Sequence, residues 1–398
     1  MHDEDRGKRQ ESIHILMAGG GTGGHVYPAL AIAAELAERG NLVSWIGRPS
    51  SMEETLVRAA DVPFHTLEAK PWVGKGLAAK AGAVATLMAS SLRARSLVRR
   101  LAADVVLGTG GYVSTPALLG ARLAGRPVFL LEPNAVAGWA NRIASRWCKA
   151  AFVAHEDAAR LLACETVVSG TPVRRSFHEV DPLPAQDPHL LVLGGSQGAV
   201  QINDVMPSVV RRLSSAAGLA GLSITHQTGR ADLASVRTAY ADLGMADLGM
   251  ADLGRVQSPK LEPMVEPRVE PTVEIVPFID DMAAAMAKAQ LVVSRAGALA
   301  IAELGAAGRP AILIPLTAAG AGHQRFNAER MADSGAAVVL AGEEVTAKNL
   351  GDTIAQLLSD RPRLESMALS ARSLAKPAAA AEISEALERA ARTQRGAA

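Results

Sequence analysis

The sequence predicts an α/β protein with two Rossmann-like halves, each built on a parallel sheet. Short β-branched runs alternate along the chain with longer Ala- and Leu-rich segments of helical period. Strands separated by helices of that size are typical of βαβ units, whose strands pair in parallel. The same order restarts near residue 190, where a strand pattern again leads into a glycine turn. The 398 residues are enough for two or three domains, so we expect one domain for each half.

Composition and charge exclude several classes of protein. Hydrophobic residues make up 49% of the chain and charged residues 20%, so a large buried core is expected. The formal net charge of +1 argues against a nucleic-acid binder that acts through bulk positive charge. Cys148 and Cys164 are too few for a disulfide framework and lack metal-ligand spacing, which favours a reducing compartment. Neither a signal peptide nor an apolar run of about 18 residues is evident, so we expect a soluble chain that could still bind a membrane surface.

Each element is expected from its own stretch of sequence. Apolar runs predict strands in the first half at 13–17, 42–46, 104–107, 128–131 and 151–153, with helices at 28–38 and 77–101. The second half is expected to hold strands at 190–193, 222–226, 273–277, 291–294 and 311–314. A polar, proline-bearing stretch at 171–188 is the natural hinge, and the alanine-rich tail at 378–395 is expected to form a closing helix.

One segment, at about 241–272, breaks this order. It contains "ADLGMADLGMADLGR", a unit of five residues written three times, and then "LEPMVEPRVEP". A period of five fits neither a helix face nor a strand face, and the prolines deny regular hydrogen bonds. We therefore expect an exposed insertion without a part in the chemistry.

The first glycine turn, "GGGTGGHVYPALAIA" at 19–33, matches the spacing G-x-G-x-x-G. A dinucleotide site would also need an acidic residue about 20 positions later, at the end of the second strand. That strand ends Trp45-Ile46-Gly47-Arg48, so NAD is disfavoured; Arg48 would suit NADP, but no hydride-transfer site follows. A P-loop is excluded because His25 stands where lysine is required. The turn still suits a pyrophosphate, because its N–H groups and the helix end converge there.

His25 is the candidate general base. It falls in the first turn of a helix at the carboxyl end of the first strand, where ligands bind in open α/β sheets. The helix end is expected to lower the imidazole pKa, which suits proton removal from a hydroxyl. A histidine that only caps the helix is the alternative, and the five neighbouring glycines favour the catalytic interpretation.

Further loops are expected at the same sheet edges. In the first half, "GTGGYVS" follows the strand at 104–107, and Glu132-Pro133-Asn134 follows the strand at 128–131, which together give a donor-rich mouth for phosphate. In the second half, "GGSQGA" at 194–199 is a further anion cradle. Downstream, Glu303 lies on a small-residue helix where its carboxylate could accept both ribose hydroxyls, and "HQRFNAERM" supplies His323, Gln324 and Asn327. The alternative for Glu303 is an ordinary surface charge.

From about Ile13 to Ala390, the chain resembles the bacterial MurG transferases of GT-B glycosyltransferase family 28. The motifs that carry the resemblance are "GGTGGHVYPALAIA", "DVVLGTGGYVSTPALLGARLAGRPV", "GTPVR", "LGGSQGA", "FIDDMAAAMAKAQLVVSRAGALAIAELGAAGRPAILIP" and "HQRFNAERM". The family moves GlcNAc from UDP-GlcNAc to the C4 hydroxyl of N-acetylmuramate in lipid I, with inversion, to give lipid II for peptidoglycan. The resemblance implies two Rossmann-like domains facing across a cleft, with no obligatory metal and no other cofactor.

The resemblance also divides the chain and assigns residues. It implies an acceptor-binding and membrane-associating domain at 12–173, a UDP-GlcNAc-binding domain at 174–372, and a C-terminal helix at 373–398 that packs back on the first domain. His25 and Glu303 are the implied catalytic residues, and loops with Gly21, Gly110, Gly111 and Tyr112 would hold the acceptor pyrophosphate. The implied UDP-GlcNAc contacts are Thr22, Gly23, Gly24, Asn134, Arg174, Ser196, Gln197, Ile279, Ala298, Leu299, Ala300, Ile301, Ala302, Glu303 and Gln324.

Two departures from the family pattern fall at the expected cleft. The family usually has His-Glu-Gln before the asparagine, whereas this chain has Leu131-Glu132-Pro133-Asn134, and the proline removes an N–H donor and stiffens the loop. A charged family loop is replaced by residues 317–322, "TAAGAG". Turnover or acceptor choice could therefore differ, although His25, Asn134, Glu303 and Gln324 are all kept.

The lipid-linked acceptor implies a peripheral site on the cytoplasmic face of the cell membrane, with an anionic inner leaflet and cell-wall synthesis proteins as partners. Leu77, Val84, Met88 and Leu92 fall near one helical face, flanked by Lys75, Lys80, Arg93, Arg95, Arg99 and Arg100. An apolar stripe with basic flanks suits such a surface. An ordinary crossover helix is the alternative.

Three other functions remain open at this point. The first is a GT-B transferase with another lipid or glycoside acceptor, and the second a UDP-GlcNAc 2-epimerase, for which Glu132 is the obvious acid/base candidate of the first half. The third is a non-catalytic UDP-sugar binder, which would be indifferent to the loss of His25.

Overall fold

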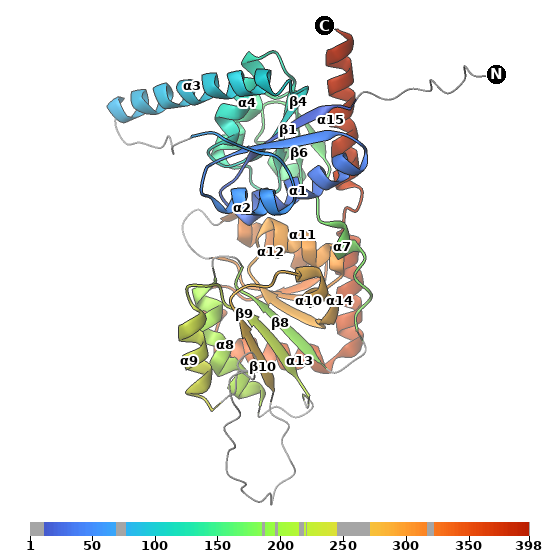
Figure 1. Cartoon of the computed structure of the whole chain (residues 1–398). Coiled ribbons are helices and arrows are strands. Elements are labelled where there is room, and N and C mark those ends of the chain that lie inside the picture. The colour runs from blue at the N-terminus through green and yellow to red at the C-terminus, as the bar shows by residue number, and fades with distance from the viewer. Residues whose placement is uncertain are drawn as a thin grey trace, which may run out of the picture. The chain divides into compact units, whose positions relative to one another are not determined.

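The computed structural model describes residues 12–68, 77–184, 188–195, 198–214, 219, 221–244, 271–316 and 322–397, which fold into two compact units (Figure 1). The first unit runs to Arg174 and resumes at Lys376; the second is Arg175–Ala375. Each unit holds one sheet whose paired strands run parallel. This confirms the predicted α/β class with two parallel-sheet halves.

The sheet of the first unit has seven strands in the order β3-β2-β1-β4-β5-β6-β7. They are β1 (His14–Gly19), β2 (Leu42–Gly47), β3 (Phe64–Thr66), β4 (Val105–Gly110), β5 (Val128–Glu132), β6 (Ala150–Val153) and β7 (Glu165–Val168). Chain order reverses at β1, which pairs with β2 on one side and β4 on the other. Ligands bind beside the carboxyl ends of the strands at such a switch point.

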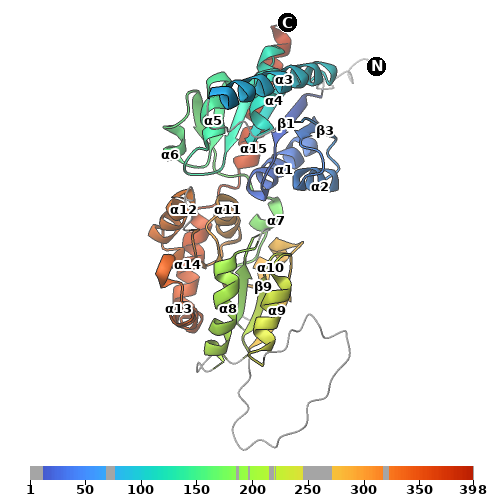
Figure 2. The ribbon, with the colours of Figure 1, turned by 90° about the vertical axis from the view of Figure 1, so that its left-hand side faces the viewer.

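Helices cover both faces of this sheet (Figure 2). They are α1 (Gly23–Glu38), α2 (Met52–Ala59), α3 (Leu77–Arg100), α4 (Ser114–Leu123), α5 (Trp139–Ala144), α6 (Glu156–Ala159) and α15 (Ala379–Gly396), with a 3-10 turn η1 (Ser145–Trp147). Because side chains alternate along a strand, Ile15 and Met17 pack in the cluster with α1 and α15. Leu16 and Ala18 pack in the opposite cluster, with α3 and α4.

The second unit repeats the plan with six strands in the order β10-β9-β8-β11-β12-β13. They are β8 (His189–Leu193), β9 (Ser223–Gln227), β10 (Thr272–Val276), β11 (Leu291–Ser294), β12 (Ala311–Leu313) and β13 (Ala337–Val339). Its helices are α7 (Arg175–His178), α8 (Val200–Leu213), α9 (Leu233–Ala241), α10 (Met282–Lys288), α11 (Ala298–Ala307), α12 (Gly322–Asp333), α13 (Ala347–Ser359) and α14 (Arg361–Ser373), with the 3-10 turn η3 (Gly342–Glu344). Within the described residues, none of the helices of either unit is both long and apolar enough to cross a membrane.

The C-terminal helix α15 belongs to the first unit, as the predicted fold class requires. Ile383 and Leu387 enter the cluster formed with α1. Arg395 donates to both carboxylate oxygens of Asp104, at 2.9 and 2.6 Å, next to the start of β4. Glu388 accepts from Arg39 Nε at 3.0 Å and from Asn41 Nδ2 at 2.7 Å. Apolar packing and two polar anchors therefore fix this distant segment of the sequence on the sheet.

The change of unit falls inside the predicted hinge, and the chain after it is bound to the second unit. Arg372, Arg309 and Arg361 each donate to a carbonyl oxygen within 178–184, at 2.8, 2.8 and 2.9 Å. Burial lowers the pKa of Arg309 to about 10. Because these cations satisfy main-chain acceptors, segment 178–184 is part of the second unit rather than a free linker.

The predicted strands are all present, with small shifts at their ends, and the helix expected at 28–38 begins earlier, at Gly23. The predicted start at Pro28 was too late, because proline is common in the first turn of a helix but here lies inside α1. Strands β3, β7 and β13 were not predicted. Most of the repeat insertion, residues 245–270, lies outside the described residues.

Candidate active site

The predicted loops of the first unit leave neighbouring strands at one edge of the sheet. Strands β1, β4 and β5 are adjacent and parallel, so the turns after Gly19, Gly110 and Glu132 emerge side by side. The structure thus brings together the three loops that the sequence analysis assigned to phosphate and sugar. Tyr112, in the second loop, is 45% exposed.

The first two glycine loops pack directly on each other. Gly20 N–H donates to Gly110 O at 3.3 Å. Gly21, Gly110 and Gly111 have φ of +99°, +102° and +81°, a region that side chains disfavour. A Cβ on Gly111 would collide with the carbonyl of Gly20. Conformation therefore favours glycine at all three positions, and close contacts also require it at Gly110 and Gly111.

His25 is the third residue of α1, in the helix turn where it was predicted. Thr22, in extended conformation, is the N-cap, so His25 does not occupy the capping position. The imidazole lies against Gly110, where an added Cβ would come within 2.9 Å of both Nδ1 and Cε1. Gly23 and Gly24 open the same helix, and the Arg174 guanidinium lies 5.2 Å from the centre of the Tyr27 ring.

Two buried carboxylates support these loops, a role that the sequence did not predict for either. Glu53, 2% exposed, accepts from Gly21 N–H at 3.4 Å and from Arg48 N–H at 3.2 Å. Glu132, fully buried, accepts from the loop that carries Asn134. A glutamate at the first turn of a helix or at a strand end was the available signal, but only the folded loops show which N–H groups it meets.

The second unit presents a similar edge after the adjacent strands β8, β11 and β12. Gly195 and Gly198, with φ of +74° and +80°, shape the turn after β8. Ser196 and Gln197 lie outside the described residues. Ile279 follows β10, which is the outer strand of the sheet, and β9 lies between β10 and β8. Ile279 is therefore not next to the loops that follow β8, β11 and β12.

A buried polar network supports the turn at Gly198. Asn203 Nδ2 donates to Asp232 Oδ2 at 2.8 Å, and Asn203 Oδ1 lies 3.1 Å from His226 Nε2. His226 Nδ1 lies 3.2 Å from the Tyr240 hydroxyl. Burial lowers the pKa of His226 to about 3, so the imidazole is neutral and links the turn to the core.

The predicted nucleotide helix is α11, which begins at Ala298 and carries Leu299, Ala300, Ile301 and Ala302 in its first two turns. Glu303, its sixth residue, is 9% exposed, which excludes the plain surface charge. Asn327 on α12 donates to Ala296 O at 3.1 Å, and Gln324 Oε1 accepts from Leu316 N–H at 3.1 Å. The first bond places α12 beside the loop that starts α11, and the second ties α12 to the segment after β12.

Arg295 is a further charged group of this edge that was not predicted from the sequence. It directly follows β11, and its Nη1 donates to Gln201 Oε1 and to Ile314 O, both at 3.1 Å. Burial lowers its pKa. A cation between the loops after β8 and β12 suits an anionic ligand. Arg295 lies within the motif "FIDDMAAAMAKAQLVVSRAGALAIAELGAAGRPAILIP", and its place directly after a predicted strand was the available signal.

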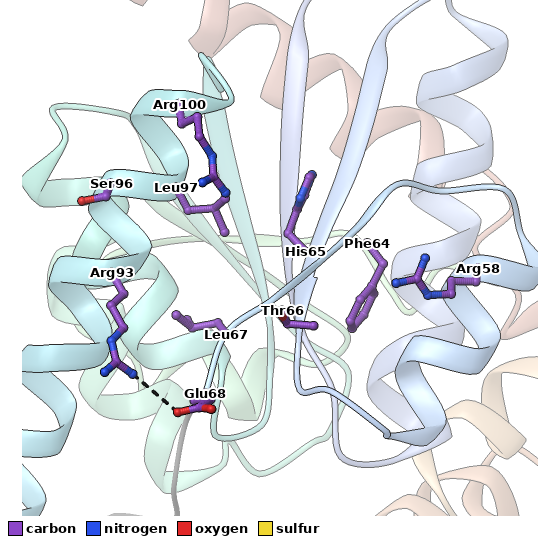
Figure 3. Close-up of a pocket in the computed structure, with 10 residues that line it drawn as sticks. All are labelled: Arg58, Phe64, His65, Thr66, Leu67, Glu68, Arg93, Ser96, Leu97 and Arg100. Atoms are coloured by element: carbon purple, nitrogen blue, oxygen red, sulfur yellow. Dashed lines mark ion pairs between the residues drawn. The ribbon is translucent and has the colours of Figure 1, made fainter.

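A pocket of about 670 Å³ lies elsewhere on the first unit, between β3 and α3 (Figure 3). Arg58, Arg93 and Arg100 line it, together with His65 and Glu68. Arg93 pairs with Glu68 at 3.6 Å, and Arg58 pairs with Glu54 at 2.9 Å. The residues of the three loops do not line this pocket.

Comparison with known proteins identifies the family. Residues 15–153 match the glycosyltransferase family 28 N-terminal domain and residues 189–385 its C-terminal domain. The chain is 39% identical to the UDP-N-acetylglucosamine–N-acetylmuramyl-(pentapeptide) pyrophosphoryl-undecaprenol N-acetylglucosamine transferase of Syntrophotalea carbinolica, over 93% of this chain and 97% of that one. It is also 39% identical to the Cellvibrio japonicus enzyme of that name, over 94% and 97%.

A solved structure agrees with these relatives. The crystal structure of MurG from Acinetobacter baumannii is 31% identical, with a TM-score of 0.72, and the match covers 95% of this chain and 99% of that one. The chain therefore belongs to glycosyltransferase family 28, among the MurG transferases.

Proposed function

We propose that this chain transfers GlcNAc from UDP-GlcNAc to the C4 hydroxyl of MurNAc-pentapeptide in undecaprenyl-pyrophosphoryl lipid I, giving lipid II. The observation that carries this proposal is the 39% sequence identity, over nearly the whole chain, to relatives named for that reaction. The two loop edges support it, because each offers backbone N–H groups and helix ends to a phosphorylated ligand.

In this reaction the second unit binds the donor. Glu303 accepts from the ribose hydroxyls, Gln324 contacts the sugar, and Ile279 lies by the uracil, with 298–302 around the nucleotide. Ser196, Gln197, Arg174 and Arg295 meet the diphosphate. In the first unit, the family resemblance assigns Thr22, Gly23, Gly24 and Asn134 to UDP-GlcNAc, and the loops with Gly21, Gly110, Gly111 and Tyr112 to the acceptor pyrophosphate.

The chemical step is an inverting displacement. His25 removes the proton from the C4 hydroxyl, the C4 oxygen bonds to the anomeric carbon, and the bond from that carbon to the UDP oxygen breaks. UDP leaves with the electron pair, and its charge is stabilised by N–H donors and arginine without a metal or other cofactor.

Transfer of labelled GlcNAc to a short-chain lipid I analogue tests the proposal. We expect wild-type transfer, and a fall of about 100-fold or more for His25→Ala, because general-base catalysis contributes roughly that much. Glu303→Ala is expected to raise the KM for UDP-GlcNAc, because a sugar-nucleotide contact is lost. His65→Ala, at a half-buried histidine of β3 outside the three loops, is the matched control and should keep wild-type transfer. Wild-type protein that binds UDP-GlcNAc but transfers nothing to lipid I would overturn the proposal.

The alternative functions have no observation of their own in their favour. An epimerase would need a carboxylate free to exchange protons with its substrate, whereas Glu132 is buried and occupied by loop donors. A transferase with another acceptor is distinguished by the same assay, because donor binding would persist without lipid II formation.

The acceptor is membrane-linked, and α3 is the surface that we propose meets the membrane. Val84, Met88 and Leu92 recur every fourth residue and are 61%, 43% and 52% exposed. Arg93 and Arg100 flank them at the pocket of Figure 3, and Arg95 Nε donates to Leu123 O. Lys75 and the side chains of Leu77 and Lys80 lie outside the described residues. An apolar stripe with basic flanks favours the anionic cytoplasmic leaflet, where cell-wall synthesis proteins would be neighbours.

A further inference from the structure

The carboxylate of Glu132 organises the whole loop between β5 and α5. Its Oε1 accepts from Asn134 N–H at 3.0 Å and from Asn134 Nδ2 at 2.8 Å. Its Oε2 accepts from Gly138 N–H at 2.9 Å and from Asn141 Nδ2 at 2.8 Å. The side chain is 0% exposed. Two bonds on each oxygen use the full acceptor capacity of a carboxylate.

This arrangement determines which way the amide of Asn134 points. A carboxylate without a proton can only accept, so the NH2 group of Asn134 must face Glu132. The amide oxygen, Oδ1, is then turned away from Glu132. The link also spans Pro133, which has no N–H of its own and fixes its φ. The loop is therefore held in place by Glu132 although the proline removes a donor.

We infer that Glu132 is a positioning residue for the donor sugar: through its bond to Asn134 Nδ2 it presents Asn134 Oδ1 as an acceptor for a sugar hydroxyl. The inference rests on the proposed function, because there Asn134 is the residue that meets GlcNAc. Glu132 itself touches no substrate. With its four acceptor sites occupied and its side chain buried, it is separated from any reacting hydroxyl.

The first test compares Glu132→Gln with wild type in binding UDP-GlcNAc and UDP. One orientation of the new amide turns its NH2 group toward Asn134 N–H and Nδ2, and the other toward Gly138 N–H and Asn141 Nδ2, so Gln at 132 no longer holds the Asn134 amide in a single orientation. We expect binding of UDP-GlcNAc to weaken by about tenfold, the effect of one lost charge-assisted hydrogen bond. UDP, which lacks the sugar, should bind as before. Glu165→Gln, at an exposed glutamate of β7 in the same unit, is the matched control.

A rescue variant separates orientation from general damage. In Glu132→Gln/Asn141→Asp, the new aspartate can accept from the NH2 group of Gln at 132, which leaves the amide oxygen for Asn134. Only Gly138 N–H then loses its partner. We expect this double variant to recover most of the affinity for UDP-GlcNAc, whereas Glu132→Gln/Asn141→Ala, which offers no acceptor at position 141, should not. Thermal unfolding of each variant shows that the measurements were made on folded protein.

Transfer kinetics complete the test. If Glu132 acts through Asn134, Glu132→Gln/Asn134→Ala should transfer no more slowly than Asn134→Ala alone, and the pH profile should keep its shape. The inference would be overturned if the losses of transfer rate in the two single variants multiplied in the double variant, or if the pH profile lost a limb. It would also be overturned if binding of UDP and UDP-GlcNAc weakened equally, or if Asn141→Asp did not restore binding of UDP-GlcNAc. Absence of wild-type transfer would instead overturn the proposed function, and the comparison of UDP-GlcNAc with UDP would still decide the role of Glu132.

Discussion

At the scale of single residues, the contact between Gly110 and His25 gives a direct prediction. Gly110→Ala places a methyl group within 2.9 Å of the imidazole and requires a side chain at φ +102°. Gly125→Ala is the matched control, because Gly125 has φ +78° but no atom within 4 Å of its added Cβ. Both variants should lose about 1 kcal/mol of unfolding free energy to backbone strain. Only Gly110→Ala should also lose transfer, by about tenfold or more, because the base is displaced.

Thermal unfolding and the lipid I transfer assay measure the two effects separately. Equal transfer by both alanine variants would show that the contact with Gly110 does not position His25.

The sequence predicted where the loop residues lie, but not which side chains hold the loops in place. Gly110, Asn134 and His25 follow strands in the sequence, so their place at a sheet edge was evident before the fold. Glu53 and Glu132 act through N–H groups whose positions depend on folded loops, and no periodicity indicates such bonds.

At the scale of elements, the anchoring of α15 predicts a local, pH-dependent contribution to stability. Burial opposes ionisation of Asp104, but the hydrogen bonds from Arg395 and from His14 N–H outweigh it and hold the Asp104 pKa below its ordinary value of 3.8. A lowered carboxyl pKa stabilises the fold above the unfolded pKa, and that stability is lost as the pH falls through the folded pKa. The anchor should therefore be intact at neutral pH and weaken below about pH 4.

Asp104→Asn should lower the unfolding free energy by about 1.5–3 kcal/mol at pH 7, because two charge-assisted bonds are lost. The difference from wild type should shrink as the pH falls below about 4. Asp157→Asn, which removes an exposed pair at 3.7 Å with Arg160, should cost under about 1 kcal/mol at any pH. Denaturant unfolding between pH 3 and pH 7 measures all three proteins. A constant cost for Asp104→Asn across that range would contradict the assigned pKa direction.

Elements with strong periodicity were predicted and short edge strands were not. β3 and β13 have three residues each, and β7 has four with little burial, so neither an apolar run nor alternation indicates them. Pairing with β2, β12 and β6 stabilises them instead. A strand that depends on its neighbour in this way has no local signal to detect.

At the scale of the whole molecule, the exposed stripe on α3 predicts membrane binding. Met88→Glu/Leu92→Glu replaces two exposed apolar side chains by charges that an anionic leaflet repels. Binding to vesicles of phosphatidylglycerol and phosphatidylcholine, measured by co-sedimentation, should fall by about tenfold or more, since each buried side chain contributes roughly 1.5 kcal/mol or more. Transfer to a short-chain, detergent-dispersed acceptor should be unaffected.

Leu369→Glu is the control, because Leu369 is 74% exposed on α14 of the second unit. Wild-type binding should also weaken at high salt, which screens the basic flanks. Unchanged binding by the double α3 variant would show that another surface meets the membrane.

The return of α15 to the first sheet has a consequence for biosynthesis. The ribosome makes β1–β7 first and the whole second unit next, and only then the helix whose Ile383 and Leu387 cover one face of the first sheet. Domains commonly fold in the order in which they emerge. Here the unit that emerges first is completed last. Until α15 arrives, the apolar face formed by Ile15, Met17 and Val105 lacks part of its cover, so the nascent chain exposes a surface there that a chaperone could bind.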